Sequence, residues 1–242
     1  MIRTVAQTGS TNADLAAGLR SGQYSAEGDW LVADRQTAGR GRLGRPWNDG
    51  FGNFMGSTVV RPASGDPPTA SLALMAGVAV HESVSLFLDK GCDLRLKWPN
   101  DLMLNDGKLA GILLEMVAGV VIVGIGVNLA IAPKVEGRRT VALGDGSPGR
   151  DAFASTLASS FARELGRWRE TGLAPLLRRW QSAAHPIGTP LMVVPPGEDR
   201  IEGAFAGLGQ DGSLLLTLTD GSLRTIHAGD VLLADAAFTG KS

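Results

Sequence analysis

The sequence predicts an α+β protein: a mixed, largely antiparallel sheet with helices on one face, followed by a small C-terminal β-barrel. Apolar residues recur at helical spacing in a few stretches only, among them 151–169. Other apolar runs are joined by tight-turn sequences such as Asn105-Asp106-Gly107, the pattern of antiparallel hairpins. Beyond Pro186, short strands alternate with Gly- and Asp-rich turns, as in small all-β barrels. We therefore expect two domains, 1–185 and 186–242.

Local patterns predict the individual elements. Thr11 with Asp14 three residues later matches a capping box and predicts a helix start. Pro68 suits the first turn of the next helix, and Pro99 stops a strand. The predicted helices are 11–20, 69–89, 151–169 and 173–184; the predicted strands are 29–33, 53–60, 93–98, 102–104, 108–117 and a further apolar strand after the Ala118-Gly119 turn.

The composition excludes several classes of protein. Hydrophobic residues make up 44% and charged residues 19% of the 242 residues, as in globular proteins and unlike disordered chains. The net charge of −1 gives no whole-chain sign of a nucleic-acid or membrane-surface binder. Glu115 and Asn128 interrupt the apolar run 111–130, so we predict no membrane span. The single Cys92 allows no internal disulfide, and with only three histidines in the chain we expect no Cys/His metal site. The first ten residues lack a signal-peptide pattern, so we expect a cytoplasmic protein.

The densest chemical signal is the tract G-R-G-R-L-G-R-P-W at 39–47. Four arginines lie between Arg35 and Arg45 with no acidic residue among them, so this loop is expected to attract polyanions. Its glycines fit the G-x-G-x-x-G dinucleotide fingerprint, but that motif must open a helix, whereas this tract runs into Pro46 and Trp47. We reject the dinucleotide interpretation. A solvated basic loop is the alternative.

A second signal is K-W-P-N-D at 97–101, followed by Lys108. Only five lysines occur in the chain, and two of them lie here within twelve residues in apolar, strand-rich surroundings. An unpaired ammonium group is costly in such surroundings, so an anionic ligand or a water-filled cleft is expected. The alternatives are an edge-strand lysine, a core Trp98 and a turn residue at Asp101.

Two further tracts are ambiguous when taken alone. Gly124 and Gly126 in an apolar strand indicate close approach of a ligand or of a neighbouring strand, and Asn128 adds a polar group at the strand end. Ser10 and Thr11 are explained by a helix cap, although a helix N-terminus also attracts anions.

The ordered set of tracts closely resembles the biotin protein ligases, over nearly the whole chain. The resemblance implies the fold of that family's catalytic domain, related to class II synthetases, with an SH3-like barrel at the C-terminus. It rests on S-T-N at 10–12, Q-T-A-G-R-G-R-L-G-R-P-W at 36–47, K-W-P-N-D at 97–101, K-L-A-G-I-L-L-E at 108–115, G-I-G-V-N at 124–128 and G-L-A-P-L-L-R-R-W at 172–180.

The resemblance implies a reaction: activation of biotin with MgATP to biotinyl-5′-adenylate, then transfer to a lysine of a biotin carboxyl carrier domain of acetyl-CoA carboxylase or a related carboxylase. Mg²⁺ is expected to be held mainly by the ATP phosphates. The positions matching the biotin pocket are Ser10, Thr11, Gln36, Gly39, Arg40, Lys108, Gly111 and Gly124. Those matching the nucleotide site are Arg42, Trp47, Asn100, Asp101 and Asn128. The expected catalytic residues are Arg40, Arg42, Lys97, Asp101 and Lys108, with Asp101 as a base or a neighbour of magnesium.

Two departures from the family pattern matter. Some biotin ligases carry an N-terminal DNA-binding domain, yet here S-T-N begins at residue 10, so we expect a monofunctional enzyme without specific DNA binding. Many relatives have serine after the tryptophan where this chain has Asn48-Asp49-Gly50, which puts the contacts of that segment in doubt. The oligomeric state stays open, with a homodimer as one alternative.

Two rival functions remain. A lipoate-protein ligase shares the catalytic fold and the adenylation chemistry, but the arginine tract and K-W-P-N-D favour biotin. A non-enzymatic nucleic-acid adaptor is disfavoured by the near-neutral charge and by the scarcity of loop aromatics.

Overall fold

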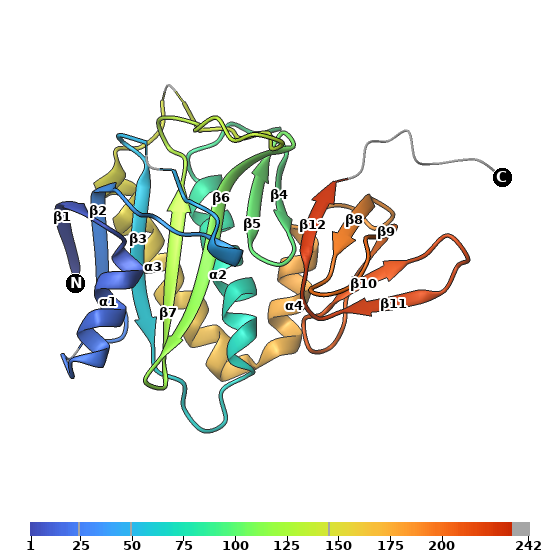
Figure 1. The fold of residues 1–242 in the computed structure, drawn as a ribbon, viewed down its shortest axis with the longest axis horizontal. Helices are drawn as coiled ribbons and strands as arrows, with labels where there is room; N and C mark the ends of the chain where they lie inside the picture. The colour runs from blue at the N-terminus through green and yellow to red at the C-terminus, as the bar shows by residue number, and fades with distance from the viewer. Residues whose placement is uncertain (24, 49, 145, 234–242) are drawn as a thin grey trace.

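The computed structural model describes residues 1–23, 25–48, 50–144 and 146–233, and its core is a seven-stranded mixed sheet in the order β1-β2-β3-β7-β6-β5-β4 (Figure 1). All neighbouring strands are antiparallel except β1 and β2. The strands are β1 (Ile2–Thr8), β2 (Trp30–Gln36), β3 (Phe54–Val60), β4 (Leu94–Lys97), β5 (Asp101–Leu104), β6 (Gly107–Val117) and β7 (Val120–Val127).

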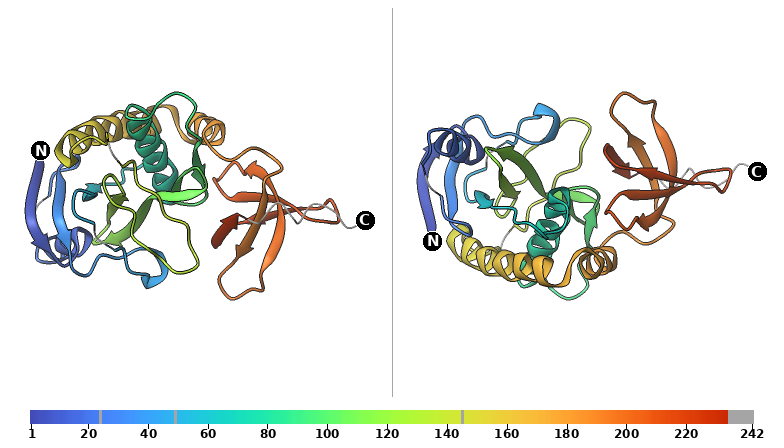
Figure 2. Two further views of the ribbon diagram at one scale, coloured as in Figure 1. Left: turned by 90° about the horizontal axis from the view of Figure 1, so that it is seen from above. Right: turned by 90° about the horizontal axis from the view of Figure 1, so that it is seen from below.

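Helices cover both faces of this sheet, but unequally. The helices α2 (Leu72–Ser85), α3 (Arg150–Thr171) and α4 (Leu173–Ser182) pack on one face and enclose the main core (Figure 2). The short helix α1 (Thr11–Arg20) lies on the opposite face, against Val59 and Ile122. Their neighbours Val60 and Val121 face the main core, as the alternation of side chains along a strand requires. The prediction of helices on one face therefore holds for α2, α3 and α4, whereas α1 lies on the other face.

The predicted turns position the central hairpins. Asn105 and Asp106 both adopt positive φ, at 48° and 62°, which is the geometry of a type I′ turn between β5 and β6. Ala118 and Gly119, at 50° and 75°, make the same kind of turn between β6 and β7. Helix α1 begins at the predicted residue, but its N-cap is Ser10, whose Oγ accepts the Ala13 N–H at 3.4 Å.

Strand β1 is absent from the sequence prediction. It pairs in parallel with β2 at the edge of the sheet, and most of its residues are exposed. An edge strand that is exposed in this way has no apolar alternation to reveal it.

The C-terminal part folds as a separate five-stranded antiparallel sheet, in the order β11-β10-β9-β8-β12. This sheet is compatible with the predicted barrel, although hydrogen bonds between β11 and β12 are not found among the described residues. It packs against the large sheet, and Trp98 Nε1 donates to the Gly212 carbonyl at 3.0 Å. The strands are β8 (Pro190–Val194), β9 (Ile201–Leu208), β10 (Leu214–Thr217), β11 (Leu223–Ile226) and β12 (Asp230–Leu233). The exact boundary at residue 185 stays a prediction.

Within the described ranges, no helix is long and apolar enough to cross a membrane.

Candidate active site

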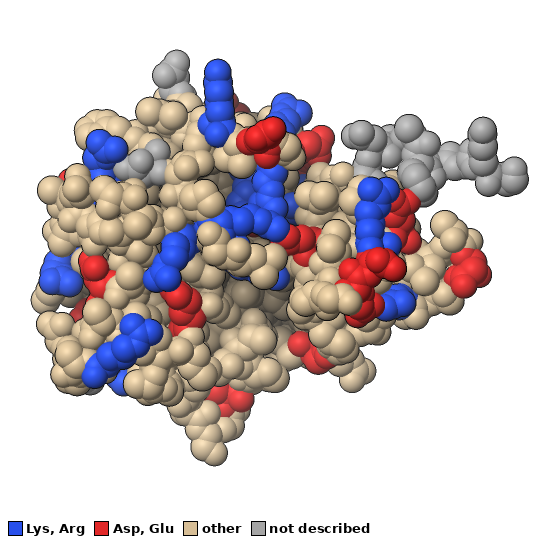
Figure 3. Space-filling view, in the orientation of Figure 1, with Lys and Arg blue, Asp and Glu red and all other residues tan. Residues whose placement is uncertain are grey.

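One cavity brings together most of the residues that the sequence singles out. It lies over the middle strands of the large sheet, beneath the loop 39–47, which we call the arginine loop, and beside the second sheet. Figure 3 shows Lys and Arg side chains gathered there at the rim of a hollow. The predicted residues that line it are Ser10, Thr11, Gln36, Arg40, Arg42, Trp47, Lys97, Asn100, Asp101, Lys108, Gly111 and Gly124.

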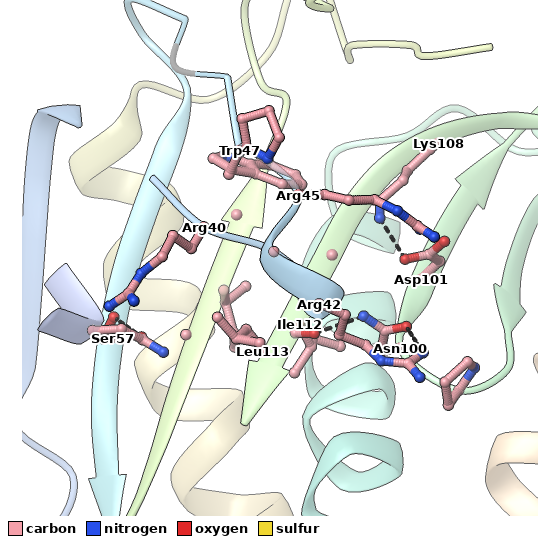
Figure 4. Close-up of a pocket in the computed structure, with 18 of the residues that line it drawn as sticks. Arg40, Arg42, Arg45, Trp47, Ser57, Asn100, Asp101, Lys108, Ile112 and Leu113 are labelled. Atoms are coloured by element: carbon pink, nitrogen blue, oxygen red, sulfur yellow. Dashed lines mark hydrogen bonds and ion pairs between the residues drawn. The ribbon is translucent and has the colours of Figure 1, made fainter. Parts of the chain in front are cut away.

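The cationic end of the cavity is built around one buried carboxylate. Lys108 Nζ lies 2.6 Å from Asp101 Oδ1, and Lys97 Nζ lies 3.2 Å from Asp101 Oδ2. The three side chains come from β4, β5 and β6, which pair so that Lys97 and Asp101 lie directly opposite each other. Figure 4 shows Lys108 and Asp101 facing each other across adjacent strands.

Electrostatics determine the protonation of this cluster. Burial alone would raise the pKa of Asp101, but the ammonium groups of Lys108 and Lys97 outweigh burial and hold this pKa below its usual value. Burial lowers the pKa of Lys97, and the Asp101 carboxylate offsets part of that effect. The cluster is therefore two cations that share one anion, and it is suited to receive a further negative charge.

The arginine loop covers the cavity from above. Backbone hydrogen bonds fold it on itself, from Trp47 N–H to the Gly39 carbonyl at 2.9 Å and from Gly41 N–H to the Arg45 carbonyl at 2.7 Å. Arg42 donates to Asn100 Oδ1 at 3.1 Å, which fixes its guanidinium beside the strand end. Its pKa is lowered by burial, in part offset by Asp101. The loop thus carries cationic groups that are held over the sheet before any ligand arrives.

Trp47 packs directly on the floor of the cavity. The Lys108 ammonium lies 5.8 Å from its ring centroid, within cation–π range. A Cβ at Gly126 would lie 2.3 Å from the indole ring, and one at Gly111 would lie 3.1 Å from it. Glycine at these two positions, one in β6 and one in β7, therefore makes room for the indole.

The opposite end of the cavity is lined mainly by neutral polar side chains, with Arg40 reaching toward it from the loop (Figure 4). Gln36 Oε1 accepts the Thr11 backbone N–H at 2.8 Å, and Thr11 Oγ1 lies 2.6 Å from Ser57 Oγ. Ser57 Oγ donates to Asn12 Oδ1 at 2.6 Å, and Asn12 Nδ2 donates to Glu115 Oε2 at 2.6 Å. Thr11, Asn12, Ser57 and Gln36 are buried. Gly124 adjoins this group, because a Cβ there would lie 2.3 Å from Asn12 Oδ1.

The second sheet supplies one wall of the cavity. Asp230 forms an ion pair with Arg45, and Lys97 Nζ donates to the Val231 carbonyl at 3.0 Å. Arg42 donates to the Gly229 carbonyl at 3.2 Å. The segment 229–231, at the start of β12, therefore holds three cations of the large sheet and its loop.

Two predicted site residues do not line the cavity. Gly39 is buried in the base of the arginine loop, where a Cβ would lie 2.7 Å from the Trp47 carbonyl. Asn128 is buried behind β6, and its Nδ2 donates to the carbonyls of Val141 at 3.0 Å and Lys108 at 3.4 Å. Asn128 thus supports the strand that carries Lys108. The doubtful segment after Trp47 includes Asp49, which lies outside the described residues.

Sequence reasoning missed several residues that line the cavity: Asn12, Arg45, Ser57, Arg138 and Asp230. Asn12 and Arg45 stand inside quoted tracts and could have been included. Ser57 lies in a continuously buried strand, Asp230 begins strand β12 of the second sheet, and Arg138 comes from a distant turn, so no local pattern marks them.

The comparisons with known proteins identify the family of the chain. The sequence model of the biotin/lipoate A/B protein ligase family matches residues 5–131. The chain is 39% identical over 228 residues to a biotin–acetyl-CoA-carboxylase ligase of Paracoccus denitrificans, covering 88% of this chain and 92% of that protein. The chain belongs to the biotin/lipoate A/B protein ligase family. It is also 36% identical to a biotin–acetyl-CoA-carboxylase ligase of Mycobacterium tuberculosis, covering 94% of this chain and 87% of that protein.

A solved member of the biotin/lipoate ligase family has the same fold. The biotin protein ligase from Aquifex aeolicus, in complex with biotin and ATP, superposes with a TM-score of 0.84 at 25% identity, covering 96% of this chain and 99% of that one. For a ligase of this family, the cavity offers a neutral hydrogen-bonding end and a cationic end, which is the arrangement needed to bind a polar ring and activate an acid group beside it.

The residues present fit magnesium only as part of a nucleotide complex. Within the described ranges, no three His, Cys, Asp or Glu side chains gather as a metal site. Asp101 and Asp230 line the cavity, and both are already paired with cations. The ion is therefore expected to arrive on the phosphates of ATP.

Proposed function

We propose that the chain is a biotin protein ligase that forms biotinyl-5′-adenylate from biotin and MgATP and transfers biotin to a lysine of a carboxylase's biotin carboxyl carrier domain. The observation that carries this proposal is the single cavity with a neutral polar end and a cationic end. The neutral end suits the ureido ring of biotin, and the cationic end suits a carboxylate and a phosphate brought together.

In the first step, a carboxylate oxygen of biotin attacks the α-phosphorus of ATP, and pyrophosphate leaves. The reacting groups are all anionic, so neutralising charge must surround them. Lys97 and Lys108 would supply it at the carboxylate and the α-phosphate, and Arg40 and Arg42 would supply it from the loop. Figure 4 shows Arg40 extending from the loop toward Ser57, at the biotin end.

The nucleotide would occupy the space beneath the loop. Trp47 presents an aromatic face for the adenine ring. Asn100 also lines the cavity and is held in place by donating to the Ile112 carbonyl at 2.7 Å. Asn128 would contribute indirectly, by supporting the strand of Lys108. We assign Ser10, Thr11, Gln36, Gly111 and Gly124 to the biotin end, with Gly39 shaping the loop base.

In the second step, the carrier lysine attacks the acyl carbon of the adenylate, and AMP leaves. Asp101 is a weak base for that lysine, because its pKa is lowered and both its oxygens face ammonium groups. We therefore assign Asp101 to holding Lys97 and Lys108 in place rather than to accepting a proton.

Several coarser properties also stand as proposals. We place the boundary between a catalytic domain and the SH3-like barrel at residue 185, and we propose a cytoplasmic enzyme, consistent with the single free thiol of Cys92. We also propose that the enzyme binds no DNA site-specifically, because its net charge of −1 gives no general attraction to nucleic acid. A gel shift at physiological salt tests this. A homodimer is the oligomeric state to test by sedimentation.

The deciding experiment is ATP–pyrophosphate exchange with biotin or lipoate as the acid, followed by labelling of a purified carrier domain. We expect exchange with biotin alone, and one biotin on each carrier domain. Exchange with lipoate but not with biotin would refute the proposal and would indicate a lipoate-protein ligase. Exchange without transfer would leave only the adenylation half-reaction.

A further inference from the structure

Arg138 lines the active-site cavity without a partner. It lies in the segment 131–141, which follows β7, and its guanidinium makes no hydrogen bond or ion pair with any described residue. We infer that Arg138 binds the leaving pyrophosphate of the adenylation step, on the side of Lys97 and Lys108 that is opposite the biotin carboxylate. This inference rests on the proposed function, because it concerns the leaving group of that reaction.

Three neighbouring cations of the cavity already have anionic partners. Lys97 and Lys108 share the Asp101 carboxylate, at 3.2 Å and 2.6 Å. Arg45 forms an ion pair with Asp230. Pyrophosphate carries several negative charges, so it is bound best where a cation is not yet neutralised by a carboxylate. The guanidinium without a partner meets this requirement.

Arg138 lies close enough to two of these cations to repel them. Burial lowers the pKa of Lys97, the Asp101 carboxylate raises it, and the positive charge of Arg138 lowers it further. Burial also lowers the pKa of Arg45, and Arg138 adds to this effect. The three cations therefore hold an excess of positive charge at one place, and an anion bound among them relieves their repulsion.

Hydrogen bonds to β6 fix the segment that carries Arg138. The Lys108 N–H donates to the Arg139 carbonyl at 2.9 Å, and the Val141 N–H donates to the Lys108 carbonyl at 3.1 Å. Asn128 Nδ2 donates to the Val141 carbonyl at 3.0 Å, which ties the same segment to the end of β7. Main-chain contacts therefore hold Arg138 beside Lys108 and leave its guanidinium free to bind a ligand.

A second cavity, which we call the side cavity, lies beyond the lysines. It shares four lining residues with the active-site cavity: Lys97, Asp101, Lys108 and Arg138. Its other lining residues are Met103, Asp106, Gly137, Arg139, Leu232 and Leu233. The two cavities thus meet at the ion cluster, and cations outnumber carboxylates in the side cavity. A polyanion displaced past the lysines has space to enter it.

The order of the strands matches an in-line displacement. The polar end of the active-site cavity is formed by α1, β2, β3 and β7, whereas the side cavity adjoins β4, β5 and β12. The ion cluster lies between them. In phosphoryl transfer, the attacking and leaving oxygens lie roughly in line, on opposite sides of the phosphorus.

This geometry sets the direction in which pyrophosphate leaves. As the carboxylate oxygen of biotin bonds to the α-phosphorus, the bond from that phosphorus to the bridging oxygen breaks on the far side, and its electron pair leaves with pyrophosphate. An acid that arrives from the polar end therefore sends the leaving group past the lysines, toward Arg138.

Three variants test the pyrophosphate site. Arg138→Gln removes the charge, Arg138→Lys keeps it, and Lys134→Gln removes the same charge from an exposed residue of the same segment that lines neither cavity. The KM for magnesium pyrophosphate is measured by ATP–pyrophosphate exchange with biotin at saturating ATP. The affinity for a sulfamoyl analogue of biotinyl-5′-adenylate, which has no pyrophosphate part, is measured by calorimetry.

We expect Arg138→Gln to raise the KM for pyrophosphate about tenfold or more, as the loss of a charge-assisted hydrogen bond does, with the affinity for the adenylate analogue within about twofold of wild type. The KM for ATP should rise in the same variant, because ATP carries the same two phosphates. Arg138→Lys should raise the KM for pyrophosphate less than Arg138→Gln does, and Lys134→Gln should stay within about twofold of wild type in every measurement.

Several outcomes would overturn the inference. A wild-type KM for pyrophosphate in Arg138→Gln is one, and an equal loss of affinity for the adenylate analogue is another, because it would place Arg138 at the AMP half of the ligand. An equal rise in Lys134→Gln would reduce the effect to long-range charge, and an Arg138→Lys protein as impaired as Arg138→Gln would exclude a role for the charge.

Failure of the proposed function has a different signature. A wild-type chain that shows no exchange with biotin would overturn the ligase assignment, whereas exchange with an unchanged KM for pyrophosphate in Arg138→Gln would overturn the pyrophosphate site alone. Because the Arg138 guanidinium holds no other part of the described chain, its variants should unfold at the wild-type temperature, which thermal unfolding checks.

Discussion

The substitution Asp101→Asn removes the anion shared by two lysines while keeping the shape of the side chain. The ammonium groups lie 2.6 Å (Lys108) and 3.2 Å (Lys97) from its oxygens, and all three side chains are less than 20% exposed. At an effective dielectric constant of about 20, each contact is attractive by about 5–6 kcal/mol, and desolvation of the ions offsets several kcal/mol of this. Removing one member of a buried ion cluster typically costs about 3–5 kcal/mol. We expect the unfolding free energy of the ligand-free protein to fall by that amount.

Pyrophosphate should partly restore the stability of Asp101→Asn, because the added anion replaces the missing carboxylate between the lysines. The assay is urea unfolding followed by tryptophan fluorescence, with and without pyrophosphate. We expect pyrophosphate to raise the midpoint of the variant more than that of wild type. Equal stability of the two proteins at pH 7, or equal stabilisation by pyrophosphate, would refute the reasoning.

The difference in unfolding free energy between wild type and Asp101→Asn should decrease at low pH. The Lys108 and Lys97 ammonium groups hold the pKa of Asp101 in the folded protein below that of an ordinary aspartate, so the folded state binds fewer protons than the unfolded state in the range where aspartates titrate. The stability contributed by the carboxylate is complete above about pH 5 and is lost as the pH falls through the folded pKa. The difference in unfolding free energy between wild type and Asp101→Asn should therefore stay constant from pH 8 to about pH 5 and disappear only in stronger acid.

Three further predictions concern the loop and its contacts. Gly126→Ala places a Cβ 2.3 Å from the Trp47 ring, so the indole must move and the KM for ATP should rise about tenfold in pyrophosphate exchange; an unchanged KM would exclude stacking of Trp47 on adenine. Asp230→Asn frees Arg45 from its ion pair for phosphate binding, so the KM for ATP should fall up to about fivefold at low salt, and the absence of any salt-dependent change would argue against a phosphate role for Arg45. Arg40→Ala should loosen the cover over the adenylate and release it to label bystander lysines; unchanged adenylate retention in a filter assay would count against a covering role.

Local chemistry was sufficient to predict most of the fold. Helix α1 spans the predicted Thr11–Arg20, and α3 extends the predicted helix by one residue at its start and two at its end. Strand β1 was missed because an edge strand that exposes most of its residues has no period-two pattern. Its parallel pairing with β2 and the position of α1 on the second face depend on packing between distant segments, which no local window contains.

The sequence predicted that the site is cationic, but not which charged side chains pair with one another. The lysines and arginines were recognised as a set that must converge on an anion, and the structure gathers them around one cavity. The sequence could not indicate that Asp101 bridges Lys97 and Lys108, because that arrangement depends on strand register. Asn128 was assigned to the nucleotide on its tract, whereas its burial behind β6 gives it a supporting position.

The segment 229–231, at the start of β12, bears on how relatives of this chain should be compared. Two of its three contacts with the cations use main-chain oxygens, those of Gly229 and Val231, which lie 187 and 134 positions from their partners Arg42 and Lys97. Any amino acid can supply a carbonyl, so substitution at these positions need not disturb the contact. Alignments that score residue identity will therefore undervalue this segment, and its contribution has to be sought in the path of the backbone.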